Sequence, residues 1–193
     1  MLRLRAETDD RWLPMVLEDF DAFLQSHAHN ERKVATSAIT LASQNPQHVE
    51  LVDAMAALAQ EELSHFHQVF KLIIARGGQL GFDRPDVYMR QMFSHVRKKH
   101  TRTFLLDRLV LFGIIEARGL ERFTLVAEGL PEGDMRAFYQ ELVRCEARHW
   151  STHHRLARLY FEEDEVKARL DEMLDLEAQS FSDLPLAPVL YGA

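Results

Sequence analysis

Long stretches of this sequence repeat apolar residues at spacings of three and four, which is the period of an α-helix that packs on one face. Four of these apolar stripes are each interrupted near the middle by a glutamate, namely Glu31, Glu62, Glu116 and Glu146. A carboxylate on the packed face of a helix loses its hydration, which costs several kcal/mol unless another charge compensates. The chain must therefore fold into helices, and a positive charge must lie close to the four buried carboxylates.

Turn residues divide the sequence into helical segments. Asn45-Pro46 and Gly77-Gly78 end the first two long segments, and the stretch from Gly129 to Gly133 separates the last two. Only 8 glycines and 6 prolines are present among 193 residues, too few for the many turns of a β-sheet protein. We expect an all-α fold, with long helices over about residues 14–43, 47–76, 103–127 and 134–161 and a shorter acidic helix over about residues 163–179.

The lengths of the connections predict how these helices are joined. The first and second long helices, and likewise the third and fourth, are separated by short loops, so each pair should form an antiparallel hairpin. The segment of about 25 residues between the second and third helices is long enough to cross the length of a bundle. We therefore expect a ferritin-like four-helix bundle with one long crossover. Residues 1–193 should form a single domain, with a bundle core over about 14–161 and a peripheral C-terminal helix and tail over 162–193.

The glutamates belong to a repeated pattern that is typical of a two-metal site. Glu62 and Glu146 are each followed three residues later by a histidine, and each is preceded by the lone glutamate of the helix before it, at a distance of 31 or 30 residues. Two divalent cations would cancel the four negative charges, and carboxylate oxygens with one imidazole per metal suit iron or manganese. Ferritin-like di-iron proteins arrange their ligands in this way. We predict a centre of two iron ions with the ligands Glu31, Glu62, His65, Glu116, Glu146 and His149.

Other polar residues give weaker signals. His27 and His153 lie one turn from predicted ligands, so they are either hydrogen-bond partners of those ligands or partly buried histidines near the bundle end. Cys145 adjoins Glu146 and is interpreted as a small packing residue. Basic residues cluster before the third helix and recur on the outer side of the fourth, where they form either phosphate contacts or solvated faces: Arg97, Lys98, Lys99, Arg102, Arg144 and Arg148.

Composition limits the class of partner and the compartment. The formal net charge of −7 argues against a protein that binds nucleic acid by bulk electrostatics, so a nucleic-acid partner would need a local basic patch. A single cysteine excludes an internal disulfide framework and a cysteine-rich metal site, and it fits a reducing compartment. The first residues lack the apolar run of a signal peptide, and no segment approaches the roughly 18 apolar residues of a membrane span. We expect a soluble cytoplasmic protein without a membrane partner.

Four segments carry a resemblance to a known family. They are HAHNERKVATSAITL around Glu31, AQEELSHFHQV around Glu62, IEARGLERF around Glu116 and CEARHW around Glu146. With these motifs the chain resembles the bacterial tRNA-(2-methylthio-N6-isopentenyladenosine) hydroxylases over roughly residues 15–160. The resemblance implies that the six predicted ligands bind iron. It also implies O2-dependent hydroxylation of the isopentenyl group on a modified adenosine beside the tRNA anticodon.

The same resemblance implies the partners of the reaction. These are tRNA as substrate, O2 as co-substrate and an external electron donor of the ferredoxin type, because the chain has no cysteine cluster of its own. An iron-oxidising or peroxide-reducing protein of the ferritin and rubrerythrin type is the alternative, although the chain lacks the Cys-x-x-Cys module of rubrerythrin. A helical bundle with satisfied polar residues and no metal is a third interpretation. Both a monomer and a dimer are compatible with the sequence.

Overall fold

The computed structural model describes residues 2–192, and all regular secondary structure within this range is α-helical, as predicted. The helices are α1 (Trp12–Glu18), α2 (Phe20–Gln44), α3 (Val49–Ala75), α4 (Val87–Ser94), α5 (Thr101–Gly129), α6 (Asp134–Tyr160) and α7 (Glu163–Ser182). They fall into two compact units. One contains residues 18–85 and 188–190, and the other contains the rest of the described chain. No helix within residues 2–192 has the length and hydropathy needed to cross a membrane.

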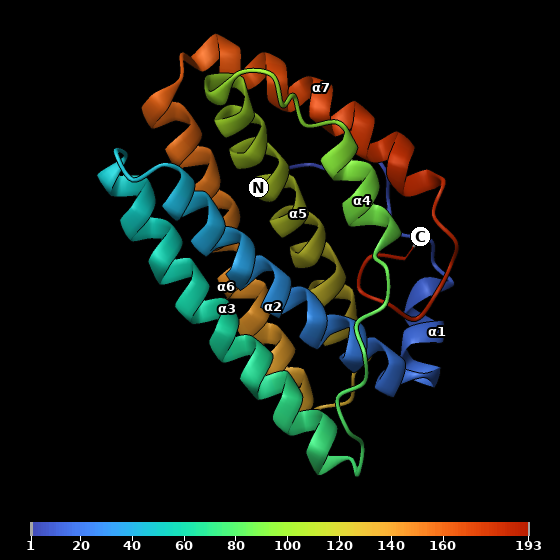
Figure 1. The fold of residues 1–193 in the computed structure, drawn as a ribbon. Coiled ribbons are helices and arrows are strands. Elements are labelled where there is room, and N and C mark those ends of the chain that lie inside the picture. Colours follow the sequence, from blue (N-terminus) through green and yellow to red (C-terminus); the bar gives the residue numbers. More distant parts are fainter. Residues whose placement is uncertain (1, 193) are drawn as a thin grey trace. The chain divides into compact units, whose positions relative to one another are not determined.

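The first unit is a hairpin of α2 and α3, which pack along each other (Figure 1). Asn45 ends α2, because its side chain donates to the carbonyl of Leu41 and its backbone N–H donates to that of Ala42. Gly77 follows α3 with a φ of +80° and donates to the carbonyl of Ile74, a left-handed conformation that favours glycine. The antiparallel pairing predicted from the short loop is confirmed for this pair of helices.

The beginning of this hairpin differs from the prediction of one helix over residues 14–43. The chain leaves the helical conformation at Asp19, whose carboxylate accepts a hydrogen bond from the backbone N–H of Ala22 and caps α2. The expected helix is therefore two helices, and α1 starts at Trp12, two residues before Pro14. Trp12 is fully buried beneath the guanidinium of Arg122, so most of α1 belongs to the other unit.

The second unit is built on the antiparallel hairpin of α5 and α6, with α7 packed along α5 and α4 packed against α7 (Figure 1). The short helix α4 was missed by the sequence analysis, which expected only a connecting segment there. Asp86 caps α4 by accepting from the backbone N–H of Met89. The segment between α3 and α5 therefore contributes a packed helix as well as a connection.

The C-terminal region was expected to be peripheral to the bundle core, and its helix α7 packs along α5 with one face buried. The inner face of α7 is buried, and Tyr191 in the tail stacks on Tyr88 at 5.0 Å between ring centroids. Glu177 on α7 is fully buried and accepts hydrogen bonds from Arg118 on α5 and from the hydroxyl of Tyr88. The acidic outer face of α7 concealed this inner face in the sequence.

Candidate metal centre

The α2–α3 hairpin brings together three of the six predicted ligands. Glu31 comes from α2, and Glu62 and His65 come from successive turns of one face of α3. All three side chains are buried, and their ligand atoms lie within 4.8 Å of one another. The Nδ1 atom of His65 lies 3.6 Å from Glu31 Oε2 and 3.5 Å from Glu62 Oε2. We call these three residues the α2–α3 set.

The pKa values of this set show that its position favours positive charge. Burial raises the pKa of Glu31, but hydrogen bonds from Glu62, His27 and His65 outweigh it and hold the pKa well below its ordinary value. Burial lowers the pKa of His65, but its hydrogen bonds with Glu31 and Glu62 raise it to about 11. An ionised carboxylate beside an imidazole that favours its protonated form marks a position that favours positive charge, such as that of a cation.

The α5–α6 hairpin brings together the other three predicted ligands. Glu116 lies on α5, and Glu146 and His149 lie on one face of α6. All are buried, their ligand atoms also lie within 4.8 Å of one another, and His149 Nδ1 is 3.7 Å from Glu116 Oε2. Burial raises the pKa of Glu116, yet hydrogen bonds with Glu146 and His149 lower it overall. We call these residues the α5–α6 set, and it repeats the chemistry of the α2–α3 set on a second hairpin.

Gly119 makes room for one of these carboxylates, which the sequence analysis did not foresee. A Cβ atom at this position would lie 3.3 Å from Glu146 Oε2 and 3.7 Å from the hydroxyl oxygen of Tyr191. A side chain on this turn of α5 would therefore press against a predicted ligand. The C-terminal tail thus reaches the neighbourhood of the α5–α6 set through Tyr191.

The donor atoms fit a divalent metal ion in each set. Two carboxylates and one neutral imidazole carry a net charge of −2, which one divalent cation neutralises, and hard oxygen donors dominate as iron and manganese prefer. Glu116 Oε1 is buried and has no hydrogen-bond partner within residues 2–192. An orphaned carboxylate oxygen in a buried site is costly, and coordination to a cation would satisfy it.

The two additional histidines have different partners. The Nε2–H of His27 donates to Glu31 Oε1 at 2.7 Å, and both side chains are buried, as expected of a residue that orients a ligand. His153 instead donates from Nδ1 to the backbone carbonyl of His149 at 3.0 Å and stacks on Phe112. His153 therefore holds the backbone of a predicted ligand.

Most of the predicted phosphate contacts are engaged with the protein itself. Arg97 donates to the buried carboxylate of Asp107, Arg102 pairs with Glu165, and Arg144 pairs with Glu141. Arg148 donates to the carbonyl of Arg144 and to the sulfur of Cys145, which is buried as expected of a packing residue. Lys98 and Lys99 are exposed and form no ion pair with the residues that the structure describes.

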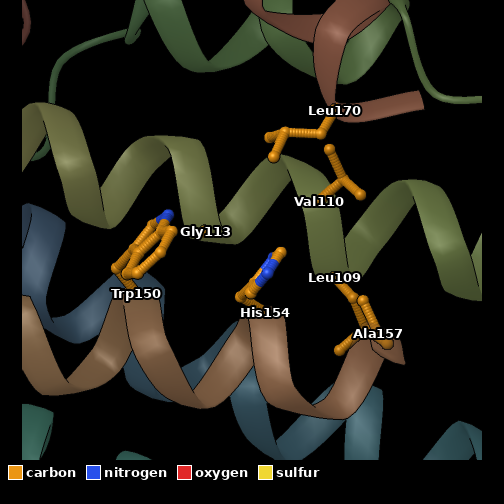
Figure 2. A pocket seen from close by; sticks show the side chains of 7 residues that line it. All are labelled: Leu109, Val110, Gly113, Trp150, His154, Ala157 and Leu170. Atoms are coloured by element: carbon orange, nitrogen blue, oxygen red, sulfur yellow. The ribbon is translucent and has the colours of Figure 1, made fainter. Parts of the chain in front are cut away.

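A small pocket in the second unit lies apart from the predicted ligands. Figure 2 shows its walls, which come from α5, α6 and α7 and consist of Leu109, Val110, Gly113, Trp150, His154, Ala157 and Leu170. Trp150 and His154 stack with their rings 5.3 Å apart at an angle of 10°. None of the six predicted ligands lines this pocket, so the buried carboxylate sets remain the candidate site.

Comparison with known proteins identifies the family. The model of the family "tRNA-(MS[2]IO[6]A)-hydroxylase (MiaE)" matches residues 2–188. The chain belongs to this family. The tRNA 2-(methylsulfanyl)-N(6)-isopentenyladenosine(37) hydroxylase of Pseudomonas putida is 34% identical over 171 residues, which cover 89% of this chain and 82% of that protein. The resemblance predicted from the four sequence motifs is thus confirmed.

Of two further proteins similar to this MiaE-family chain, one is longer and the other is named for a different activity. The Salmonella typhimurium protein of the same name is 37% identical over 139 residues, which cover 72% of this chain and 49% of that protein. A solved structure named "Protein 43 with aldehyde deformylating oxygenase activity from Synechococcus" has a TM-score of 0.94 and 30% sequence identity, and the match covers 100% of this chain and 97% of that one.

Proposed function

We propose that this MiaE-family chain is an O2-dependent iron hydroxylase that acts on the isopentenyl group of 2-methylthio-N6-isopentenyladenosine beside the tRNA anticodon. The observation that carries the proposal is the pair of buried carboxylate and histidine sets on two hairpins of a chain whose family match runs through residues 2–188. The relatives from Pseudomonas and Salmonella carry the name of this activity.

The metal ligands in this proposal are the residues of the two sets. Glu31, Glu62 and His65 would hold one iron ion, and Glu116, Glu146 and His149 would hold the other, as one di-iron centre. When bound, the iron supplies the activation of O2 and the transfer of one oxygen atom into a C–H bond. The reaction consumes two electrons and two protons and releases water. Electrons come from an external donor, for which we propose a ferredoxin-type system, because the chain has a single cysteine.

The protein's own groups have three tasks in this scheme. The carboxylates neutralise the metal charge and fix its position, and His27 orients Glu31 through its hydrogen bond. The buried apolar side chains around the sets exclude bulk water from the reacting atoms. The neighbours of Glu31 and Glu116 keep these carboxylates ionised for a cation: burial raises the pKa of both carboxyl groups, but interactions with the other side chains of each set lower it overall.

We also propose that the chain is one ferritin-like domain, in which α2, α3, α5 and α6 are the four bundle helices and the segment from residue 76 to residue 100 is the crossover. A helical hairpin with an apolar stripe needs a further layer to cover that stripe, which supports a single core. One cooperative unfolding transition is expected for such a domain. With tRNA as substrate, we place the enzyme in the cytoplasm.

The nucleosides of tRNA test the function directly. We expect tRNA from a strain that lacks this protein to contain 2-methylthio-N6-isopentenyladenosine without its hydroxylated form, as measured by mass spectrometry. A plasmid copy of the chain should restore the hydroxylated nucleoside. An unchanged nucleoside profile in the deletion strain would exclude the proposed substrate.

An assay with the purified protein distinguishes tRNA hydroxylation from two competing functions, aldehyde oxygenation and iron storage. The named activity of the structural relative from Synechococcus makes a long-chain aldehyde the appropriate comparison substrate. The iron-loaded protein, supplied with O2 and a reductant, should hydroxylate tRNA purified from the deletion strain and leave the aldehyde intact. Turnover of the aldehyde without turnover of tRNA would reverse the assignment, and accumulation of ferric mineral would favour the ferritin-type alternative.

Replacement of His27 by alanine should weaken metal binding by about 10- to 100-fold, because Glu31 loses the partner that orients it. Anaerobic titration with Co²⁺, followed by its absorption spectrum, measures this affinity. His29→Ala is the matched control, since His29 lies on the same helix but bonds to the carbonyl of Gly81. Equal losses of affinity in both variants would assign His27 a general structural role instead.

A further inference from the structure

Arg108 on α5 is a buried cation that has no anionic partner among the residues that the structure describes. Only 6% of its surface is exposed, and its Nε atom is buried without a hydrogen-bond acceptor. No carboxylate or carbonyl within residues 2–192 accepts a hydrogen bond from its guanidinium. The adjacent carboxylate of Asp107 is already engaged, because Arg97 and Arg169 both donate to it. A buried charge without a counter-charge is rare in proteins because of its desolvation cost.

The surroundings of Arg108 are aromatic. Its guanidinium carbon lies 5.5 Å from the ring centroids of Phe93 and Phe104 and 5.0 Å from that of Phe112. Cation–π contacts of this kind offset part of the desolvation cost and hold the guanidinium in place without occupying its N–H donors. Burial lowers the pKa of Arg108, and no nearby carboxylate raises it again. The donors of a positioned guanidinium are therefore left for a ligand.

The position of Arg108 relates it to the α5–α6 set. Arg108, Phe112 and Glu116 are spaced by four residues and lie on one face of α5, so Arg108 is two turns, about 12 Å along the axis, from the predicted ligand. Phe112 is buried and stacks on His153, which bonds to the backbone of His149. A row of rings thus connects the guanidinium with the predicted metal ligands within the second unit.

Two lysines lie in the segment that joins two of these aromatic residues. Phe93 and Phe104 are only partly buried, and between them in the sequence lie the exposed side chains of Lys98 and Lys99, which have no ion pair within the described chain. The positive charges of these lysines and of Arg108 favour an anionic ligand in this part of the second unit. A guanidinium presents a planar fork that matches the oxygens of a phosphate group.

We propose that Arg108 is a phosphate-binding residue, which holds a backbone phosphate of the RNA substrate while the alkyl group of the modified base extends toward the α5–α6 set. This inference rests on the proposed function and adds a substrate contact to it. The separation along α5 is comparable with the length of a nucleotide from its phosphate to the end of an alkyl group on its base. The phosphate would supply the counter-charge that Arg108 lacks in the free protein.

Two synthetic anticodon stem-loops that contain the modified adenosine test this contact. One has normal linkages, and in the other the linkages on both sides of the modified nucleoside are neutral methylphosphonates. We expect the iron-loaded protein, kept anaerobic, to bind the normal RNA about 10- to 100-fold more tightly, as measured by fluorescence anisotropy. Arg108→Met should bind both RNAs alike. Arg158→Met, which removes an exposed arginine paired with Glu163, should keep the wild-type discrimination.

Stability separates the proposed role from a structural one. Removal of a buried charge that has no partner should leave the melting temperature of Arg108→Met unchanged or raise it, and Arg108→Gln provides a second neutral variant if methionine disturbs the packing. Wild-type discrimination retained in a folded neutral variant would overturn the proposal, as would equal binding of both RNAs by the wild type. If either result were found while the wild type still hydroxylated tRNA, this inference alone would fail. If the wild type neither bound the RNA nor hydroxylated tRNA, the proposed function itself would fail.

Discussion

Replacement of Glu116 by alanine should lower kcat/KM for tRNA hydroxylation by about 1,000-fold or more, which corresponds to ~4 kcal/mol of transition-state stabilisation. Glu116 is buried, lies 3.7 Å from His149 and has a carboxylate oxygen without a hydrogen-bond partner within the described chain. Its loss would leave the α5–α6 set with one carboxylate for a divalent metal. Steady-state hydroxylation of tRNA with controlled iron loading measures the effect.

The helix itself should tolerate this change, because alanine has the highest helix propensity and leaves α5 continuous. Far-ultraviolet circular dichroism should therefore match that of the unmodified protein, while bound iron falls from two ions toward one per chain. Glu128→Ala is the control, since Glu128 is an exposed carboxylate near the end of the same helix. Unchanged turnover in Glu116→Ala would remove this residue from the metal centre.

The elements of the two hairpins and the groups of ligands in them were accessible from the sequence because both leave local signals. A glutamate in an apolar stripe is conspicuous, and the repeat of Glu62 with His65 and of Glu146 with His149 indicates which face of each helix is involved. The structure brings Glu31 to the first pair and Glu116 to the second, because short loops make antiparallel neighbours. Apolar periodicity and loop length were thus sufficient to predict which three ligands each hairpin brings together.

The features that were missed leave no signal in an apolar stripe. Helix α5 is buried on nearly all sides because α6 and α7 both pack on it, so a search for one apolar stripe cannot describe it. Arg118 and Arg122 on this helix are fully buried, although arginine is ordinarily a surface residue. The break at Asp19 is a capping interaction of a single side chain within a helical pattern, which periodicity does not detect.

The partners of the basic residues were likewise not predictable from the sequence. Arg97 and Arg102 were candidates for phosphate contacts, but their carboxylate partners are Asp107 and Glu165, the second of which lies 63 residues away in the sequence. Arg108 was not a candidate because it lies within an apolar run, yet it is a buried arginine that has no acidic partner within residues 2–192. A cluster of basic residues in a sequence therefore does not show which of them are paired within the protein and which can bind a ligand.

Replacement of Glu177 by alanine should lower the free energy of unfolding by about 3 kcal/mol, which corresponds to a fall of about 6–12 °C in melting temperature for a chain of this size. Glu177 and Arg118 are both fully buried and joined by two hydrogen bonds, and Tyr88 also donates to this carboxylate. The variant leaves the positive charge of Arg118 inside the protein, where the partly exposed Glu121 is its one remaining acidic partner within residues 2–192. Calorimetry of the metal-free protein measures the change without a contribution from iron.

Two further variants separate the buried pair from a general effect of charge on α7. Glu172→Ala removes an exposed carboxylate that pairs with Arg169 on the same helix. It should cost less than about 1 kcal/mol, because water screens the exposed carboxylate and Arg169 keeps its buried partner Asp107. The double variant Arg118→Met/Glu177→Leu removes both buried charges and should recover most of the lost stability. If the double variant were as unstable as Glu177→Ala, lost packing around Phe181, whose ring lies 3.7 Å from the Arg118 guanidinium, would explain the loss better than an uncompensated charge.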